Sequence, residues 1–287
     1  MAPRANDSRL PLFGGTALAE RMERAEAQLV ARVSEAARRR GANPAGFVLP
    51  VVGGVASFAG QGSPFNKIAG LGFGGVTGAA ALEGIERAFT ACGAPVQIEL
   101  AHLADPAIGA LLAERGYRLV SFENVLGRAL TDLPERVTPP GVEVRPSGDE
   151  GLGAWLKVVV EGDLHPDTQG VASHEEFARE VVISAERDLA AVPGVRRYVA
   201  LHDGVIAGGA SWRMAGGIAQ FTGAATAPAH RRQGVQSALL SARLADAAAA
   251  GCDVAIVTTQ PGSKSQQNTQ RRGFDLLYTR AVLIKQP

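Results

Sequence analysis

The sequence contains an internal repeat, and this repeat constrains the fold more than any other feature. Residues Ala113–Leu119 (AERGYRL) align with Gln270–Leu276 (QRRGFDL), which places Gly116 on Gly273 at an offset of 273 − 116 = 157 residues. Around this match the same order of expected elements recurs: strand, short helix, aromatic turn and long strand. A repeat of this kind predicts two halves that fold alike.

The composition is that of a globular protein long enough for two domains. The chain has 287 residues, of which 46% are hydrophobic and 20% are charged. A formal net charge of +1 excludes the domain-wide basic field that nucleic-acid binding needs. No apolar run is long enough to span a membrane, and the N-terminus lacks a secretion signal. The chain has two cysteines, Cys92 and Cys252, so we expect no disulfides and a cytoplasmic protein. No histidines or cysteines have metal-ligand spacing, so we expect no metal.

A proline-rich segment divides the chain. Residues Pro134–Gly141 contain three prolines and are expected to link a first domain, 1–133, to a second, 142–287. The alternation of strands and helices predicts an α/β (α+β) fold. A capping box of Ser173 and Glu176 is expected to start one of the helices. Helices are expected at 16–40, 79–92, 106–114, 149–160, 174–189, 235–250 and 265–272, and strands at 96–102, 197–202, 205–213, 218–226, 253–259 and 275–284.

A basic loop lies between the strand at 218–226 and the helix at 235–250. The N-terminus of a helix presents unpaired N–H groups and the positive end of the helix dipole, so it favours an anion. Gly234 lets the backbone approach phosphate oxygens closely because it has no Cβ. The pattern indicates a site for the diphosphate of a nucleotide-like cofactor, with an ordinary solvated turn as the alternative. The loop residues are Arg231, Arg232, Gln233, Gly234, Val235, Gln236 and Ser237.

The loop and its surroundings resemble the GNAT superfamily of N-acetyltransferases. The motif of that family, Arg/Gln-x-x-Gly-x-Gly/Ala after the fourth strand, is matched by Arg231 and Gly234, with Gln236 in the last position. Pro228 stands where the family often has proline, and the Gly273-Phe274 turn follows in the family's order. The resemblance covers residues 145–285 and, more weakly, 46–130. It implies two tandem GNAT-like domains, each a mixed, mostly antiparallel twisted sheet flanked by helices.

The resemblance also implies acetyl-CoA as co-substrate and a way to bind it. Backbone groups of Ala224, Ala225 and Thr226 would bond the pantetheine arm. The N–H groups of the loop from Arg231 to Ser237 would bind the pyrophosphate, and the thioester would lie between the fourth and fifth strands. We expect the Gln236 side chain to point outward and leave the backbone free.

The catalytic residues are marked less clearly. The family often has a tyrosine proton donor four residues before the Gly-Phe turn, where this chain has Thr269. Tyr278 is the nearest other phenol and the candidate donor, with packing against the sheet as its alternative. Asn268 is the candidate for orienting the thioester or pantetheine, with a helix-surface position as its alternative. His165 is either a general base or a loop histidine.

The first half lacks the loop. At the repeat offset, residues 231–236 correspond to Gly74–Ala79 (GGVTGA), which has glycines but neither arginine. We therefore expect a degenerate first domain that has lost its cofactor. The expected function is direct transfer of acetyl from acetyl-CoA to an amine of a small molecule or peptide. The alternative is an acyl-CoA-binding pseudoenzyme that acts as a sensor or binds a partner. The acceptor, the acyl-chain preference and the choice between monomer and homodimer stay open.

Overall fold

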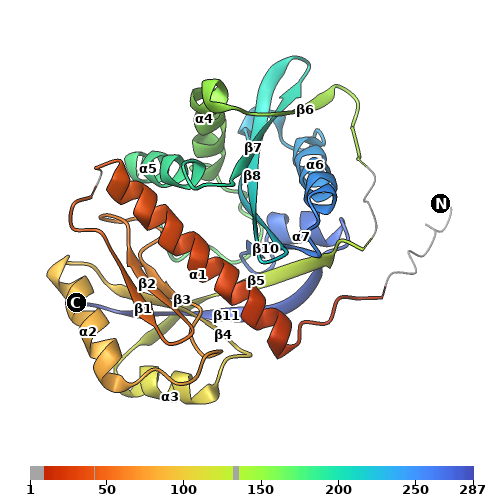
Figure 1. The fold of residues 1–287 in the computed structure, drawn as a ribbon. Helices are drawn as coiled ribbons and strands as arrows, with labels where there is room; N and C mark the ends of the chain where they lie inside the picture. Colours follow the sequence, from red (N-terminus) through yellow and green to blue (C-terminus); the bar gives the residue numbers. More distant parts are fainter. Residues whose placement is uncertain (1–9, 42, 132–135) are drawn as a thin grey trace.

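The structure of the chain is a computed structural model that describes residues 10–41, 43–131 and 136–287. The repeat is visible in the order of the elements of its two halves (Figure 1). The first half comprises α1 (Thr16–Arg39), β1 (Phe47–Val51), β2 (Gly54–Phe58), β3 (Lys67–Ala69), α2 (Ala79–Ala91), β4 (Val96–Ala101), α3 (Pro106–Glu114) and β5 (Arg118–Ala129). The second half comprises β6 (Val142–Pro146), the short 3-10 helix η1 (Asp149–Gly151), α4 (Leu152–Asp163), α5 (Arg179–Ala190), β7 (Arg196–His202), β8 (Val205–Ala215), β9 (Ile218–Thr226), η2 (Pro228–His230), α6 (Val235–Ala249), β10 (Val254–Thr259), α7 (Lys264–Gln270) and β11 (Asp275–Lys285).

The two halves share one mixed sheet because each sends its last strand into the other. The eleven strands run in the order β1-β2-β3-β4-β11-β5-β10-β9-β8-β7-β6. Strand β11 pairs with β4 of the first half, β5 pairs with β10 of the second, and β5 and β11 pair with each other at the centre. Most pairs are antiparallel, and the parallel ones are β3–β4 and β9–β10. The predicted fold class is confirmed, and the two expected sheets are joined edge to edge.

The helices cover both faces of this sheet. In β9, Ile218 packs with residues of α1, whereas its neighbour Ala219 packs with residues of α6. Adjacent strand residues point to opposite faces, so α1 and α6 lie on opposite sides. In β8, Gly209 touches α4 while Ala210 joins the α6 cluster, so α4 shares the face of α1. Helix α5 contacts α1 on this face through an ion pair between Arg40 and Asp188, 2.8 Å.

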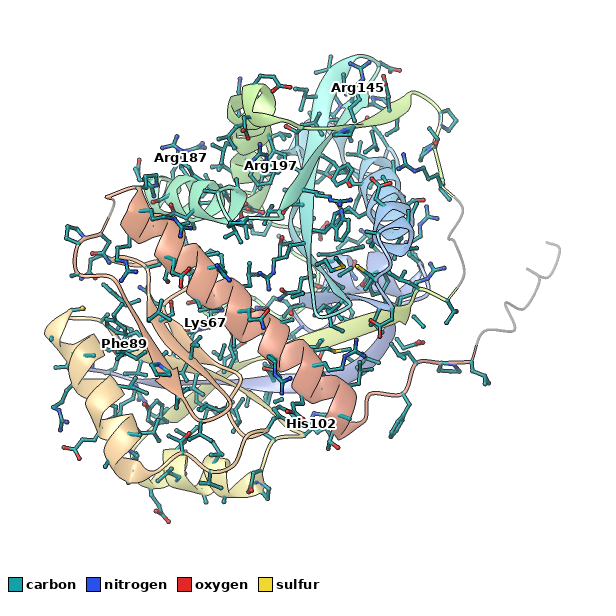
Figure 2. All side chains as sticks on the ribbon, in the orientation of Figure 1. Lys67, Phe89, His102, Arg145, Arg187 and Arg197 are labelled. Atoms are coloured by element: carbon teal, nitrogen blue, oxygen red, sulfur yellow. The ribbon has the colours of Figure 1, made fainter. Side chains whose placement is uncertain are left out.

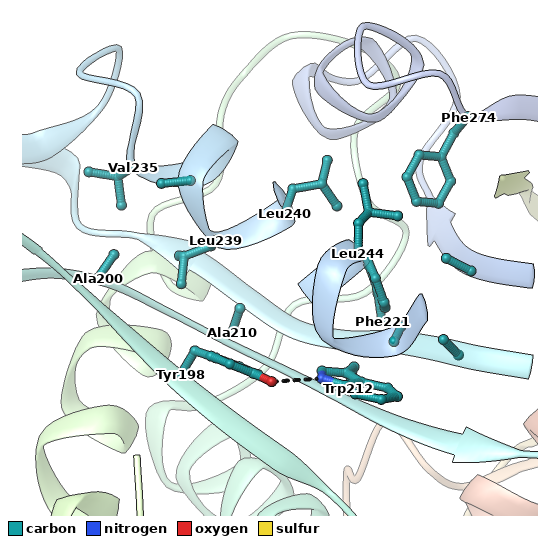
Figure 3. Close-up of a cluster of buried hydrophobic side chains, with 14 of the residues drawn as sticks. Tyr198, Ala200, Ala210, Trp212, Phe221, Val235, Leu239, Leu240, Leu244 and Phe274 are labelled. Carbon is teal, nitrogen blue, oxygen red and sulfur yellow. Dashed lines mark hydrogen bonds between the residues drawn. The ribbon is translucent and has the colours of Figure 1, made fainter. Parts of the chain in front are cut away.

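Helix α6 is held by the largest apolar cluster of the second half (Figure 3). Leu239, Leu240 and Leu244 are almost fully buried on its sheet-facing side, and each contributes about 1.5–3 kcal/mol of hydrophobic stabilisation. Beneath them, the indole N–H of Trp212 donates to the Tyr198 hydroxyl at 3.0 Å. This packing fixes the position of the helix N-terminus relative to β9.

The helices and strands predicted above agree with the structure to within a few residues at their ends, apart from the start of α5, and the helix expected at 149–160 is observed as η1 followed by α4. The expected capping box at Ser173 and Glu176 is wrong: the N-cap residue is Ala178, and the Ser173 hydroxyl accepts from the N–H of Glu175 at 3.2 Å. The segment before α5 instead crosses toward the first half, where the Nε2 of His174 lies 3.5 Å from Gln97 Oε1 on β4. The predicted linker, 134–141, falls partly outside the described residues, and the domain boundaries stay a prediction.

None of the helices in the described ranges is both long enough and apolar enough to cross a membrane.

Candidate functional site

Strand β9 separates from β10 after a short parallel stretch. Their pairing covers Ile218–Gln220, opposite Val254–Ile256. Beyond Gln220, β9 continues to Thr226 in register with β8, while β10 continues beside β5. The edge of β9 from Phe221 to Thr226 therefore turns its backbone groups toward a space that no described strand fills. An extended ligand can add to such an edge as a strand would.

A bulge in β9 lies on this free edge. Ser211 of β8 is opposite Thr222, but Gly209 is opposite Ala225, so Gly223 and Ala224 share one partner residue. Gly223 has φ +50°, a left-handed conformation that glycine adopts without strain. The bulge changes the direction of the backbone groups near the point where the two strands separate.

The N-terminus of α6 follows directly and carries free N–H groups. Gly234 is the N-cap residue with φ +85°, and Arg232 is also left-handed with φ +63°. No side chain in the described part of the chain caps this helix, and its first bond runs from Ala238 N–H to the Gly234 carbonyl at 2.9 Å. The N–H groups of Val235, Gln236 and Ser237 thus precede the helical ladder and face outward from its end. This arrangement suits an anion.

Two buried side-chain oxygens, one at the end of β9 and one in the first turn of α6, lack partners. Among the described residues, neither Thr226 Oγ1 nor Gln236 Oε1 has a hydrogen-bond partner, although both are shielded from solvent. Buried polar atoms are nearly always paired, so such atoms mark a place where a ligand or water completes the bonding. Gln236 is therefore turned into the protein, and the expectation that it points outward is wrong. The free β9 edge, the helix terminus and these two oxygens suit a ligand with an extended arm and an anionic group.

The remaining loop residues are more open to solvent. Arg232 and Gln233 are exposed. Arg231 is half-buried and donates from Nη2 to the carbonyl of His165, which ties the loop to the end of α4. Gly234 also packs closely, because a Cβ there would lie 2.7 Å from Pro139.

The structure separates the two catalytic candidates. Asn268 is half-buried on α7, next to Thr269, whose hydroxyl donates to the carbonyls of Ser265 and Gln266 in its own helix. The structure does not bring Tyr278 to the loop. Its hydroxyl donates to Glu23 of α1 at 2.6 Å, in a buried cluster.

Burial and the charge of Glu23 raise the pKa of Tyr278 well above its ordinary value. A buried phenol that already donates to a carboxylate, with a raised pKa, is a poor proton donor to a thiolate elsewhere. This geometry supports the packing alternative for Tyr278 and not the role of proton donor.

A carboxylate that the sequence did not single out lies against the bulge. Glu186 of α5 places Oε2 3.0 Å from where a Cβ on Gly223 would stand. This oxygen is buried and has no partner among the described residues. Burial, and then the charge of Asp163 at the end of α4, raise the pKa of Glu186 well above its ordinary value. A signal existed, because Glu186 occupies a position of the apolar stripe with Val182, Ala185 and Leu189.

In the corresponding part of the first half, two backbone segments pack closely against each other. A Cβ on Gly54 would lie 1.9 Å from the Ala69 carbonyl oxygen, and one on Gly74 would lie 2.9 Å from Gly53 Cα. These glycines allow the β1–β2 turn to pack on the segment after β3. The ammonium of Lys67 also binds the carboxylate of Glu99 across β3 and β4.

No group of three or more histidine, cysteine, aspartate or glutamate side chains that could hold a metal ion occurs among the residues that the structure describes.

Comparison with known proteins gives a family match for part of the chain and a fold for most of it. Residues 162–274 match the model of the acetyltransferase (GNAT) family. The chain is similar to a GCN5-related N-acetyltransferase from Kribbella flavida, with 21% identity over 90% of this chain and 95% of that one and a TM-score of 0.63. It is also similar to a tandem GNAT protein from the clavulanic acid biosynthesis pathway, with 16% identity over 88% and 87% of the chains and a TM-score of 0.58. A comparison with curated protein sequences finds no match.

Proposed function

We propose, from the premise that the C-terminal half of this chain belongs to the GNAT acetyltransferases, that the protein transfers the acetyl group of acetyl-CoA to an amine. The observation that carries the proposal is the free edge of β9 leading to the uncapped N-terminus of α6. A strand edge and a helix terminus in this order suit a ligand with an extended amide arm and a diphosphate.

The residues of the loop divide the binding between them. Backbone groups of Ala224, Ala225 and Thr226 hold the pantetheine arm, and the N–H groups from Arg231 to Ser237 hold the diphosphate. The Thr226 hydroxyl and the Gln236 amide gain the partners that they lack. Bound acetyl-CoA supplies an activated thioester. Asn268 on α7 is proposed to orient the arm from the other side.

The acceptor is proposed to be an amine of a small molecule or a peptide. It approaches from the face of α4 and α5, because α6 and α7 cover the opposite face. The two cysteines are free thiols, and a reducing compartment such as the cytoplasm keeps thiols in this state.

A second candidate function is binding of an acyl-CoA without turnover. The proton-donor position favours it, because the Thr269 hydroxyl is engaged within its own helix and the Tyr278 hydroxyl is engaged with Glu23. Both functions require acetyl-CoA binding, and only the enzyme releases thiol. Release of CoA in the presence of primary amines, followed with a thiol reagent, separates the two.

The variant Ser237→Glu tests the loop. Ser237 is the third residue of α6. A carboxylate at this position is stabilised by the helix dipole but repels a diphosphate. We expect the protein to fold as before and to lose at least about tenfold in acetyl-CoA affinity, which is ~1.4 kcal/mol. Isothermal titration calorimetry measures the affinity, and circular dichroism checks the fold.

The matched control is Ala81→Glu, at the third residue of the corresponding helix α2. It adds the same charge at the same helical position in the first half and should leave the affinity unchanged. Equal losses in both variants would argue for a general charge effect. No loss in Ser237→Glu would overturn the placement of the diphosphate. The variant Gly234→Val is less specific, because its side chain would also meet Pro139.

A further inference from the structure

The bulge of β9 is contacted from the α5 side by one acidic side chain. Glu186 Oε2 lies 3.0 Å from the position of a Cβ on Gly223, and Ser211 Oγ lies 3.1 Å from the same point. The Ser211 hydroxyl is engaged with Thr222, 2.9 Å from its Oγ1. The carboxylate oxygen, by contrast, is buried without a partner among the described residues. A carboxylate in this state is ready to accept a proton or a hydrogen bond from a group placed at the bulge.

We propose that Glu186 is the general base that takes the proton from the acceptor amine. The inference rests on the proposed function and adds to it the residue that activates the acceptor. The bulge is where β9 leaves β10, which is the part of the free edge nearest to the point of separation. An amine that reaches a thioester held along this edge from the face of α4 and α5 meets the Glu186 carboxylate.

The charged surroundings of Glu186 are simple. Asp163 of α4 is the charged group that acts on it within the described residues, and its negative charge adds to the effect of burial on the pKa of Glu186. Strands β8 and β9 present the neutral Ser211, Thr222 and Gly223. Helix α1 meets α5 further along, through the ion pair of Arg40 with Asp188.

No described cation lies beside Glu186, so when its carboxyl group is ionised, an acceptor that arrives as an ammonium ion supplies the missing positive charge. The Glu186 carboxylate then removes one N–H proton and becomes a neutral acid. The amine lone pair forms the N–C bond to the acetyl carbonyl, and the C–S bond breaks. The second proton on nitrogen passes to the departing thiolate. The products are the amide and the CoA thiol, and Glu186 returns its proton to water.

The test compares Glu186→Gln and Glu186→Asp with the parent in the full-length protein. The probes are acetyl-CoA with n-butylamine, 1,3-diaminopropane or the tripeptide Ala-Ala-Ala, and acetyl-CoA alone with water as the acceptor. A thiol reagent follows CoA release between pH 5 and pH 9. We expect Glu186→Gln to reduce kcat/KM about 100-fold or more and to remove the rise of kcat/KM with pH. Glu186→Asp retains the rise at a reduced rate, because its carboxylate is withdrawn by one methylene.

Calorimetry with acetyl-CoA distinguishes this inference from the proposed function. The affinity of Glu186→Gln for acetyl-CoA should equal that of the parent. The control Glu180→Gln removes an exposed carboxylate from the same helix and should match the parent in both measurements. If the parent binds acetyl-CoA but Glu186→Gln keeps its rate and pH profile, the assignment of Glu186 is wrong while the proposed function stands. If the parent does not bind acetyl-CoA, both are wrong.

A readout without turnover completes the test. The side-chain carboxyl carbon of Glu186 is observed by NMR in protein with 13C-labelled glutamate, and its signal is assigned by its absence in Glu186→Gln. With CoA bound, the pKa of this carboxyl should lie well above the pKa values of the exposed glutamates. A pKa of about 4 for this carboxyl, the ordinary value for glutamate, would overturn the inference even if no amine in the set is acetylated.

Discussion

The two parallel strand pairs of the sheet, β9–β10 in the second half and β3–β4 in the first, differ in how far the first strand continues beyond the pairing. In the second half, β9 runs on beyond its pairing with β10 and leads to a helix end with free N–H groups. In the first half, β3 is short and pairs with β4 at Ile68 and Ile98. A cofactor loop needs an open approach to the backbone, and in the first half the β1–β2 turn packs closely on the segment after β3.

Ion pairs lie on the α1 side of the strands of the first half. Lys67 binds Glu99, and Arg280 of the exchanged strand β11 lies 2.7 Å from Glu23 and 3.4 Å from Glu99. Lys67 lies beside α1 in the space between this helix and the sheet (Figure 2). Because Arg280 comes from the second half, this cluster joins the two halves. The comparison shows one topology with an open strand edge in the second half and with a buried ion-pair cluster in the first, and we propose that only the open edge binds a ligand.

The largest expected effect on this comparison comes from Lys67→Met. Burial alone would lower the pKa of Lys67, but the charges of Glu99 and Glu123 raise it, so the ammonium is retained in the fold. Removing it leaves the buried Glu99 carboxylate with Arg280 as its remaining partner. We expect a loss of about 3 kcal/mol in the free energy of unfolding, measured by urea denaturation.

The affinity of folded Lys67→Met for acetyl-CoA should stay at the parental value, because the cluster supports the first half. The double variant Lys67→Met/Glu99→Gln should recover part of the lost stability, since no uncompensated charge remains. The exposed Lys157→Met on α4 is the control and should change little. A variant that is stable but no longer binds acetyl-CoA would contradict the division between the two strand pairs.

The sequence predicted one of these strand pairs better than the other. The loop at Arg231–Ser237 follows from local pattern, because a strand, a glycine and a helix start determine where N–H groups point. The exchange of β5 and β11 is set by long-range pairing that short-range periodicity does not report. Tyr278 was chosen as the candidate proton donor because it follows the Gly273-Phe274 turn in the sequence, whereas its hydroxyl is bound to Glu23 of α1. Glu186 was missed because Gly223, against which it lies, is distant from it in the sequence.

An intermediate effect is expected from Tyr278→Phe, which tests whether this phenol supports the cluster or the chemistry. Its hydroxyl donates to Glu23, a carboxylate that is 2% exposed. Loss of a hydrogen bond to a buried charged group costs about 2 kcal/mol, so the midpoint of thermal unfolding should fall while CoA release keeps its rate. An unchanged midpoint together with slowed CoA release would restore Tyr278 as the proton donor.

The smallest effect on stability near pH 5 is expected from Glu123→Gln, at the edge of the same cluster. Burial, followed by the charge of Glu99, raises the pKa of Glu123 to about 8. The unfolded chain releases this proton near pH 4.3, a typical glutamate pKa, while the folded protein keeps it until about pH 8. The stability that protonated Glu123 contributes is therefore fully present below its pKa in the unfolded chain. It is lost as the pH rises through its pKa in the folded protein.

Glutamine does not titrate, so Glu123→Gln should lose less stability than the parent between pH 5 and pH 8. The difference in thermal midpoint, variant minus parent, should become steadily more positive as the pH rises from 5 to 8. Differential scanning calorimetry at matched ionic strength measures this difference, and the exposed Glu114→Gln on α3 is the control. A difference that stays constant with pH would mean that Glu123 is ionised throughout. The first half would then carry the negative charge of Glu123 beside α1. In this respect it would resemble the α5 side of the proposed ligand edge, where Glu186 lies.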